Sequence, residues 1–91
     1  MANDPGIGYR ITATVVEAKG HCNAGLQAGD SFEISIHNPA AMCGVFYHQI
    51  FPTLSVLQFG GKMPWWQGDA VIAQCSDPVN TVTVKLERSA R

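Results

Sequence analysis

The chain has 91 residues, of which 46% are hydrophobic and 14% are charged, and its formal net charge is −1 at pH 7. This length allows a single domain, and the apolar content excludes an intrinsically disordered chain. The charge balance is not that of a protein that binds nucleic acid or an anionic membrane surface, so we expect neither partner. Because so few charges keep the copies apart, the composition favours a homo-oligomer.

The N-terminal segment 1–8 has little apolar surface to bury, and we expect a flexible tail there before a single domain over 9–91. It has neither the basic nor the apolar region of a signal peptide, which predicts a cytoplasmic protein. Residues 34–59 contain no Asp, Glu, Lys or Arg, but they contain histidine, proline, asparagine and glutamine. We therefore expect a buried core segment there and not a membrane span.

Alternation of apolar and polar residues predicts two strands near the start of the domain. Residues 9–16 alternate and are rich in β-branched side chains, which predicts a strand with one better-buried face. Residues 19–25 contain two glycines and are expected to form a loop. A Gly-Asp turn signal precedes a second alternating run over 31–36, which Asn38-Pro39 is expected to end.

The middle of the chain changes to helical spacing. Residues 40–50 place Phe46 and Ile50 on one stripe, which predicts a helix. Proline lacks an N–H and clashes with the preceding helical turn. We therefore expect a break or kink at Pro52 and a second helical piece over 53–59.

Two further strands are predicted over 70–75 and 81–88, where apolar residues alternate again. The turn over 77–80 is short enough for a hairpin, and Asp77 is expected to bond the backbone of this turn. The order β-β-α-β-β with short links predicts the α+β class. We expect a small, mainly antiparallel four-stranded sheet packed with one interrupted helical segment.

The chain contains three cysteines, Cys22, Cys43 and Cys75. An odd number in a cytosolic chain argues against a disulfide framework, so they are thiols, metal ligands or a mixture. Three soft ligands from separate segments suit zinc, iron or copper, with His48 or His21 as a fourth ligand. The alternative is that each cysteine packs as a small hydrophobic residue, because no C-x2-C or H-x3-H spacing is present.

Cys43 is also a candidate on its own, because it lies where the helix is expected to begin. The N-terminus of a helix stabilises a thiolate, which makes Cys43 the best single nucleophile or redox residue. His48 would be its general base if the helix break brings the two side chains together. A regular helix places these positions about 140° apart, and His48 also suits a hydrogen-bonded core position.

A loop rich in glycine and tryptophan over 60–68 is the third candidate. Its glycines allow close backbone approach, and its indole rings offer large apolar surfaces. The residues expected to line an apolar ligand pocket are Gly60, Gly61, Phe46, Trp65 and Trp66. The tryptophans also suit a contact between subunits, and the alternative is a structural turn whose rings cover the core.

Several separated motifs follow one another along most of the chain. They are Gly20-His21-Cys22, Gly29-Asp30-Ser31-Phe32, Cys43, Phe51-Pro52, Leu57-Gln58-Phe59-Gly60-Gly61, Pro64-Trp65 and Cys75-Ser76-Asp77-Pro78-Val79-Asn80. Together they resemble a family of small, functionally uncharacterised single-domain prokaryotic proteins. Its three recurrent cysteines imply that the thiols act together. The family often has proline after the second and third cysteines, where this chain has Gly44 and Ser76. The resemblance implies no reaction, substrate or cofactor.

These observations predict a small cytoplasmic protein with a thiol site that binds a soft metal ion or cluster, zinc or iron, through Cys22, Cys43 and Cys75. Two alternatives stay open. One is a small enzyme or accessory subunit that uses Cys43 beside an apolar ligand pocket. The other is a structural interaction module whose cysteines only pack. The sequence does not decide whether the protein is an enzyme.

Overall fold

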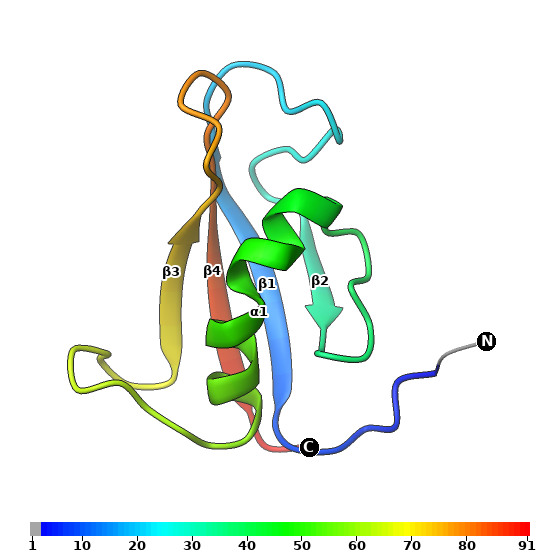
Figure 1. Cartoon of the computed structure of the whole chain (residues 1–91), viewed down its shortest axis with the longest axis vertical. Helices are drawn as coiled ribbons and strands as arrows, with labels where there is room; N and C mark the ends of the chain where they lie inside the picture. Colours follow the sequence, from blue (N-terminus) through cyan, green and yellow to red (C-terminus); the bar gives the residue numbers. More distant parts are fainter. Residues whose placement is uncertain (1–2) are drawn as a thin grey trace.

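The computed structural model describes residues 3–91. The elements are β1 (Arg10–Ala18), β2 (Ser31–Ile34), α1 (Gly44–Gln58), β3 (Ala70–Gln74) and β4 (Val82–Ser89). The strands form one antiparallel sheet in the order β2-β1-β4-β3, and α1 lies across one face of it (Figure 1). The predicted α+β class, the four antiparallel strands and the hairpin of the last two strands are therefore confirmed.

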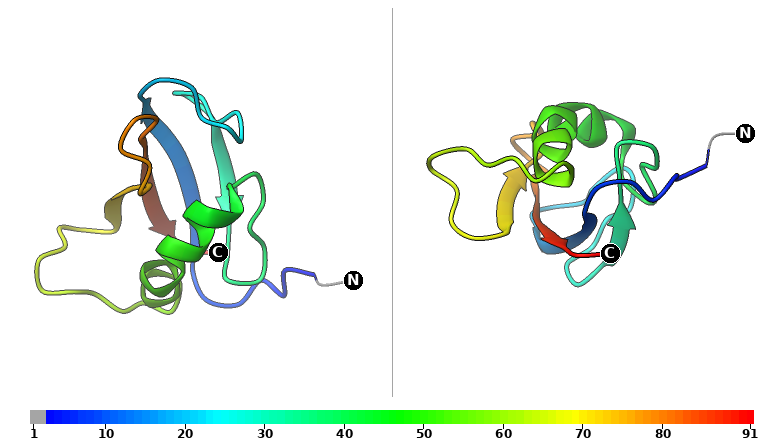
Figure 2. Two further views of the ribbon diagram at one scale, coloured as in Figure 1. Left: turned by 45° about the horizontal axis from the view of Figure 1, so that its top comes forward. Right: turned by 90° about the horizontal axis from the view of Figure 1, so that it is seen from below.

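The core lies between the sheet and α1, while the opposite face of the sheet carries no helix (Figure 2). The register pairs Ala13 of β1 with Leu86 of β4 and Val15 with Val84, so these side chains share the inner face. On α1, apolar residues recur every three or four positions and turn one stripe to the sheet. The buried apolar residues are Ile11, Ala13, Val15, Leu26, Ile34, Met42, Phe46, Ile50, Leu54, Leu57, Val82, Val84 and Leu86.

A β-bulge lies near the end of β1, where the register with β4 shifts between Val15 and Glu17. Val16 is the extra residue, and its side chain is exposed. The shift changes which positions face inward, so that Ala18 packs against the core. Without the bulge, the period of two would turn Ala18 to the outer face of the sheet. The bulge therefore lets β1 run two residues past its predicted end at 16 with its last side chain inside.

The segment between β2 and α1 is longer than predicted, because β2 ends at Ile34 and α1 begins only at Gly44. Ala40, where the helix was expected to begin, has a φ of 50° and thus left-handed backbone. Such a residue cannot belong to a right-handed helix. The side chain of Asn38 accepts the Ala40 N–H at 2.9 Å and stabilises this turn. Cys43 becomes the N-cap residue of α1.

The predicted break at Pro52 is not found, because α1 is one helix from Gly44 to Gln58 and contains Pro52. Pro52 removes the N–H that would bond to the carbonyl of His48. Both residues are exposed, so water can replace the missing donor, while the buried stripe keeps the helix against the sheet. α1 has 15 residues. No helix within residues 3–91 has the length and apolar character that a membrane span needs.

Gln58 is a fully buried polar residue in the last turn of α1. Its side-chain oxygen accepts the Ile36 N–H at 2.9 Å, and its side-chain nitrogen donates to the Ile7 carbonyl at 3.1 Å. Its backbone carbonyl accepts the Tyr9 N–H at 2.7 Å. Gln58 thus holds the segments before β1 and after β2 against the helix. Residues 1 and 2 of the predicted tail lie outside the described residues.

We expect the substitution Gln58→Leu to lower the free energy of unfolding by about 2 kcal/mol. It leaves the Ile36 N–H and the Ile7 carbonyl without their partner, and an unpaired buried polar group is costly. Denaturant unfolding followed by circular dichroism measures the change. Gln67→Leu replaces an exposed glutamine and is the matched control, with little expected effect. Equal losses in the two variants would contradict this role of Gln58.

Candidate functional site

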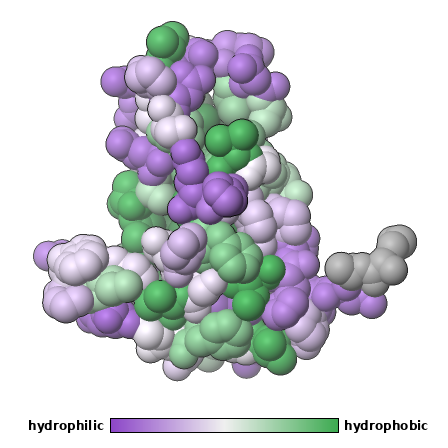
Figure 3. Space-filling view, viewed as in Figure 1, coloured by the Kyte–Doolittle hydropathy of each residue, from purple (hydrophilic) through white to green (hydrophobic). Residues whose placement is uncertain are grey.

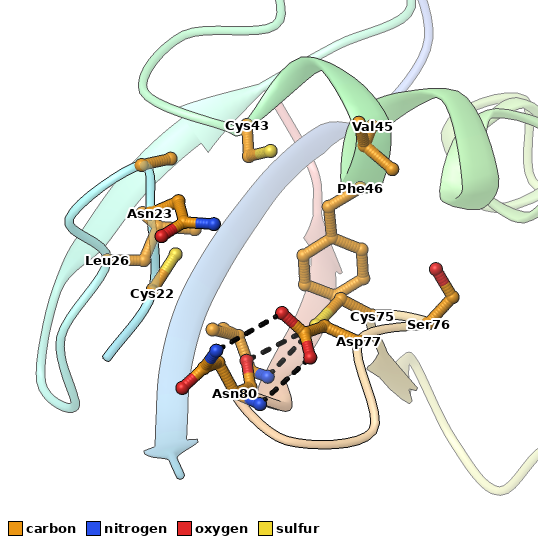
Figure 4. A pocket seen from close by; sticks show the side chains of 12 residues that line it. Cys22, Asn23, Leu26, Cys43, Val45, Phe46, Cys75, Ser76, Asp77 and Asn80 are labelled. Atoms are coloured by element: carbon orange, nitrogen blue, oxygen red, sulfur yellow. Dashed lines mark hydrogen bonds between the residues drawn. The ribbon is translucent and has the colours of Figure 1, made fainter. Parts of the chain in front are cut away.

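All three cysteines line one pocket of about 230 Å³ at the end of the sheet where β3 ends and β4 begins (Figure 4). Cys22 lies in the loop after β1, Cys43 caps α1, and Cys75 directly follows β3. The other residues that line this thiol pocket are Asn23, Ala24, Leu26, Val45, Phe46, Ser76, Asp77, Asn80 and Val82. Three segments that are far apart in the chain thus bring every thiol of the protein to one place.

None of the three cysteines is fully buried, and each is half-buried. Free cysteine is among the residue types most often found fully buried in protein cores. The sulfur atoms of Cys22 and Cys43 face the interior of the pocket, one from the loop after β1 and the other from the start of α1 (Figure 4). The thiols are therefore placed where a ligand in the pocket can reach them.

The sulfur of Cys75 takes part in the hydrogen bonding of the β3–β4 hairpin. The Cys75 N–H donates to the Val82 carbonyl at 3.0 Å, as in a regular ladder. The Val82 N–H donates back to Cys75 Sγ at 3.1 Å, and the Cys75 thiol donates to the Asn80 carbonyl at 3.8 Å. These bonds fix the position of the Cys75 sulfur in the hairpin, with one backbone N–H directed at it.

Asn80 joins two of the segments that form the pocket. Its side-chain oxygen accepts the His21 N–H at 2.8 Å, which ties down the loop that carries Cys22. Its backbone N–H donates to Asp77 Oδ1 at 3.0 Å, and its side-chain nitrogen donates to Asp77 Oδ2 at 3.4 Å. Asn80 is therefore the residue that positions the Cys22 loop against the turn after Cys75. The sequence predicts only a turn here, although the Asn80 at the end of its Asp-Pro-x-Asn run offers a side-chain amide to a second segment.

Asp77 serves its own turn, as predicted. Its carboxylate accepts the N–H groups of Asn80 and Val79, and these two bonds lower the pKa of Asp77 below its usual value. The carboxylate is thus ionised, and its oxygens are already engaged. Although Asp77 lines the pocket, it holds the turn together and leaves the three sulfurs as the chemically distinctive groups.

The close approach of the two loops needs a glycine at position 20. Gly20 has a φ of +60°, which favours glycine. A Cβ at this position would lie 3.2 Å from the Val79 carbonyl and would overlap the side-chain oxygen of Asn80. The Gly20-His21-Cys22 run therefore combines close backbone contact, a backbone donor and a thiol in three consecutive residues.

The N-terminus of α1 carries no acidic residue in its first turn, and Cys43 makes no side-chain capping bond. The positive end of the helix dipole therefore faces the Cys43 side of the pocket without a carboxylate to compensate it. Negative charge on a ligand-bound sulfur suits this position. Val45 and Phe46, from the same turn, supply apolar wall beside it.

The histidines are not part of the thiol pocket. His48 is exposed on α1 and does not line the pocket, so the structure does not bring it to Cys43. His21 lines a neighbouring hollow of about 220 Å³, which shares Cys22 and Leu26 with the thiol pocket. Within residues 3–91, no group of three or more His, Cys, Asp or Glu side chains is positioned to hold a metal ion.

The glycines at the end of the helix have a structural role. Gly60 has a φ of +82°, and its N–H donates to the Leu57 carbonyl, while the Gly61 N–H donates to the Val56 carbonyl. These two bonds close the helix in the way typical of a glycine cap. The guanidinium of Arg88 donates to the carbonyls of Leu57 and Gly61 and places positive charge at this end of the dipole.

The structure separates Phe46 from the tryptophan loop, although both were expected to line one apolar pocket. Phe46 lies in the first turn of α1 and lines the thiol pocket. Trp65 and Trp66 lie in the loop that leaves the other end of α1 and runs to the far end of the sheet (Figure 1). Trp66 packs against the core, whereas Trp65 is 75% exposed. The apolar wall beside Cys43 is thus built without tryptophan.

Comparison of the chain with known protein families, with curated protein sequences and with solved structures finds no match in any of the three. The function proposed for this chain therefore depends on the pocket and its side chains.

We expect Asn80→Ala to loosen two walls of the thiol pocket and not the third. Cys22 and Cys75 should react faster with an alkylating reagent, because their loops lose the shared amide, while Cys43 should react as before. Site-resolved alkylation followed by mass spectrometry measures the three rates. Asp4→Ala, which removes the side-chain acceptor of the Gly6 N–H in the segment before β1, is the matched control and should change none of them. A uniform increase at all three thiols would contradict the positioning role of Asn80.

Proposed function

We propose that this protein binds a soft metal ion, zinc or iron, through the sulfurs of Cys22, Cys43 and Cys75. The observation that carries the proposal is that all three cysteines of the chain line one half-open pocket. If the cysteines served only to pack, there would be no reason for them to gather at one opening instead of dispersing through the core.

The donor set of the pocket favours a soft ion. The carboxylate and amide groups of Asp77 and Asn80 are engaged with each other and with backbone. The remaining walls are mostly apolar, with Leu26, Val45 and Phe46 among them, and their polar side chains, Asn23 and Ser76, are neutral. Thiolate is the soft ligand that zinc and iron accept and that magnesium and calcium do not prefer. Oxygen-binding cations are therefore poor candidates.

The surroundings of the sulfurs offset the negative charge that metal-bound thiolates bring. The Val82 N–H donates to Cys75 Sγ, and the helix N-terminus without acidic residues lies at Cys43. Binding requires the sulfurs to approach one another, because sulfurs that share a tetrahedral ion with Zn–S bonds of about 2.3 Å lie roughly 3.5–4 Å apart.

A second candidate is a small enzyme or accessory subunit that uses Cys43. The uncapped helix N-terminus at Cys43 and the apolar wall of Val45 and Phe46 favour it. An electrophilic or apolar small molecule in the pocket would then contact this thiol. Either function needs reduced thiols, so we propose that the protein works in the cytoplasm.

We expect the reduced protein to bind one equivalent of Zn(II) and to show thiolate-to-metal charge-transfer absorption with Co(II). Anaerobic titration measures both, and protons should be released because the ligands must be deprotonated. Cys22→Ser, Cys43→Ser and Cys75→Ser should each weaken binding by roughly tenfold or more, while His48→Ala should leave it unchanged.

The outcomes of this titration separate the candidates. Binding that survives in all three serine variants, or no binding by the reduced wild-type protein, would refute the metal proposal. If only Cys43 proves reactive toward electrophiles and no metal binds, the second candidate is supported. If neither metal binding nor selective thiol reactivity is found, the cysteines serve only for packing.

A further inference from the structure

The two edges of the sheet are protected very differently. At the β2 edge, Glu33 is exposed and forms ion pairs with Arg10 and Arg91 at 3.2 and 3.6 Å. The β3 edge consists of Ala70-Val71-Ile72-Ala73-Gln74, with no charged residue and no proline. Ile72 is 59% exposed, and the apolar surface along β3 is visible in Figure 3. Natural proteins usually protect an open edge with charge, proline or a bulge, so the β3 edge is unusual.

The hydrogen bonds of the hairpin show which backbone groups of β3 point outward. Cys75 N–H donates to the Val82 carbonyl and Arg88 N–H donates to the Asp69 carbonyl. Hydrogen-bonded pairs alternate along an antiparallel ladder, so Val71 and Ala73 bond to β4. The N–H and carbonyl groups of the residues between them therefore point to the free edge.

The usable part of this free edge is short. Ala70 already forms a bridge with Gln67 across the turn before β3. The outward N–H and carbonyl groups that remain in β3 are those of Ile72 and Gln74. These two N–H and two carbonyl groups lie symmetrically on either side of Ala73. The edge can therefore pair with an identical edge if the two Ala73 residues lie opposite each other.

We propose that β3 pairs with β3 of a second copy of this chain, antiparallel and with Ala73 opposite Ala73. In this register Ile72 of one copy lies opposite Gln74 of the other, and each N–H donates to the carbonyl of the opposite residue. The two-fold axis generates a second, identical pair of hydrogen bonds. The Ala73 residues form a non-hydrogen-bonded pair, where the strands bring Cα atoms within about 4.5 Å and small side chains fit best. The two sheets become one continuous sheet.

Charge favours a second copy as the occupant of this edge. Two copies of an uncharged strand meet without like-charge repulsion. The nearest charged residue on β4 is Lys85, which lies opposite Ile72 of its own chain. Ile72 in turn lies opposite Gln74 of the second copy, so one strand separates Lys85 from that copy. Beyond Gln74 of the second copy lies its Thr83, so the two Lys85 side chains are not adjacent.

The loop between α1 and β3 enlarges the contact. It projects from the sheet beside β3 in all the views (Figures 1 and 2). It carries Trp65, whose side chain is 75% exposed. A strand added to β3 would lie alongside this loop, and the two-fold axis places each loop beside the end of the other β3. A tryptophan side chain can bury about 150–250 Å², which the short backbone edge alone does not provide.

The test is the oligomeric state of variants, measured by sedimentation equilibrium from micromolar to millimolar protein. The wild-type chain should form dimers. Ile72→Lys should weaken the dimer by more than roughly tenfold, because it places two charges beside the two-fold axis. Trp65→Ala should weaken it less. Val16→Lys, at an exposed valine of the bulge in β1, is the matched control and should dimerise like the wild type.

Amide hydrogen exchange provides a second readout that does not depend on a substitution. The Ile72 and Gln74 amides should become protected as protein concentration rises, while the Glu33 amide at the β2 edge should not. A wild-type monomer, or a dimer that persists unchanged in Ile72→Lys, would overturn the proposal. A monomer whose β3 edge instead captures a strand peptide from another protein would overturn it as well, since the occupant would then be a different chain.

Discussion

The pairing of β1 with β4 is the constraint on which the rest of the structure depends. These are the longest strands, with 9 and 8 residues, and they lie in the centre of the sheet although they come from opposite ends of the chain. Closing so long a segment costs chain entropy, which burial of the inner face must offset. Val15 opposite Val84 and Ala13 opposite Leu86 supply part of that burial. The register of these two strands also positions the loop that follows β1 and the turn that precedes β4.

The thiol pocket is a direct result of this register. The end of β1 lies beside the start of β4, so the loop that follows the one strand meets the turn that precedes the other. The His21 N–H can then reach Asn80, and Gly20 allows the backbones to approach. The third wall, at Cys43, comes from α1, which is held at its far end by the buried Gln58. Two loops and one helix end thus meet at a site that no single element could form.

The few charges of the chain are placed unevenly, and this decides which surfaces are open. Arg10 and Arg91 meet Glu33 at the β2 edge, and Arg88 meets Asp69 below β3. The exposed Arg10–Glu33 pair contributes little to stability, but charge on an edge strand opposes pairing with another chain. β3 and the whole of α1 lack charged residues. The low charge content therefore reflects an unguarded edge and an unusually apolar helix.

The sequence by itself determined the elements whose signals are local. Period-two alternation located the four strands, helical spacing located most of α1, and the turn chemistry of Asp77 was readable because an aspartate bonds its own backbone. The boundaries of two elements differed from the prediction for physical reasons: a local bond from the Ala40 N–H to Asn38 forms a left-handed turn before α1, and the bulge at Val16 depends on the register of β1 with β4. The break expected at Pro52 did not occur because packing of the buried stripe outweighs one missing hydrogen bond.

Only the tertiary structure decided what surrounds the cysteines. Their spacing has no local period, so nothing in the sequence pattern states that Cys22, Cys43 and Cys75 share a pocket; the register of β1 with β4 and the position of α1 bring them together. The same register gives Asn80 its role, because its partner His21 is distant in the chain. The length of α1 separates Phe46, in its first turn, from Trp65, in the loop after its last turn. A contact between distant segments depends on how strands pair, and a single sequence shows only which residues can form strands.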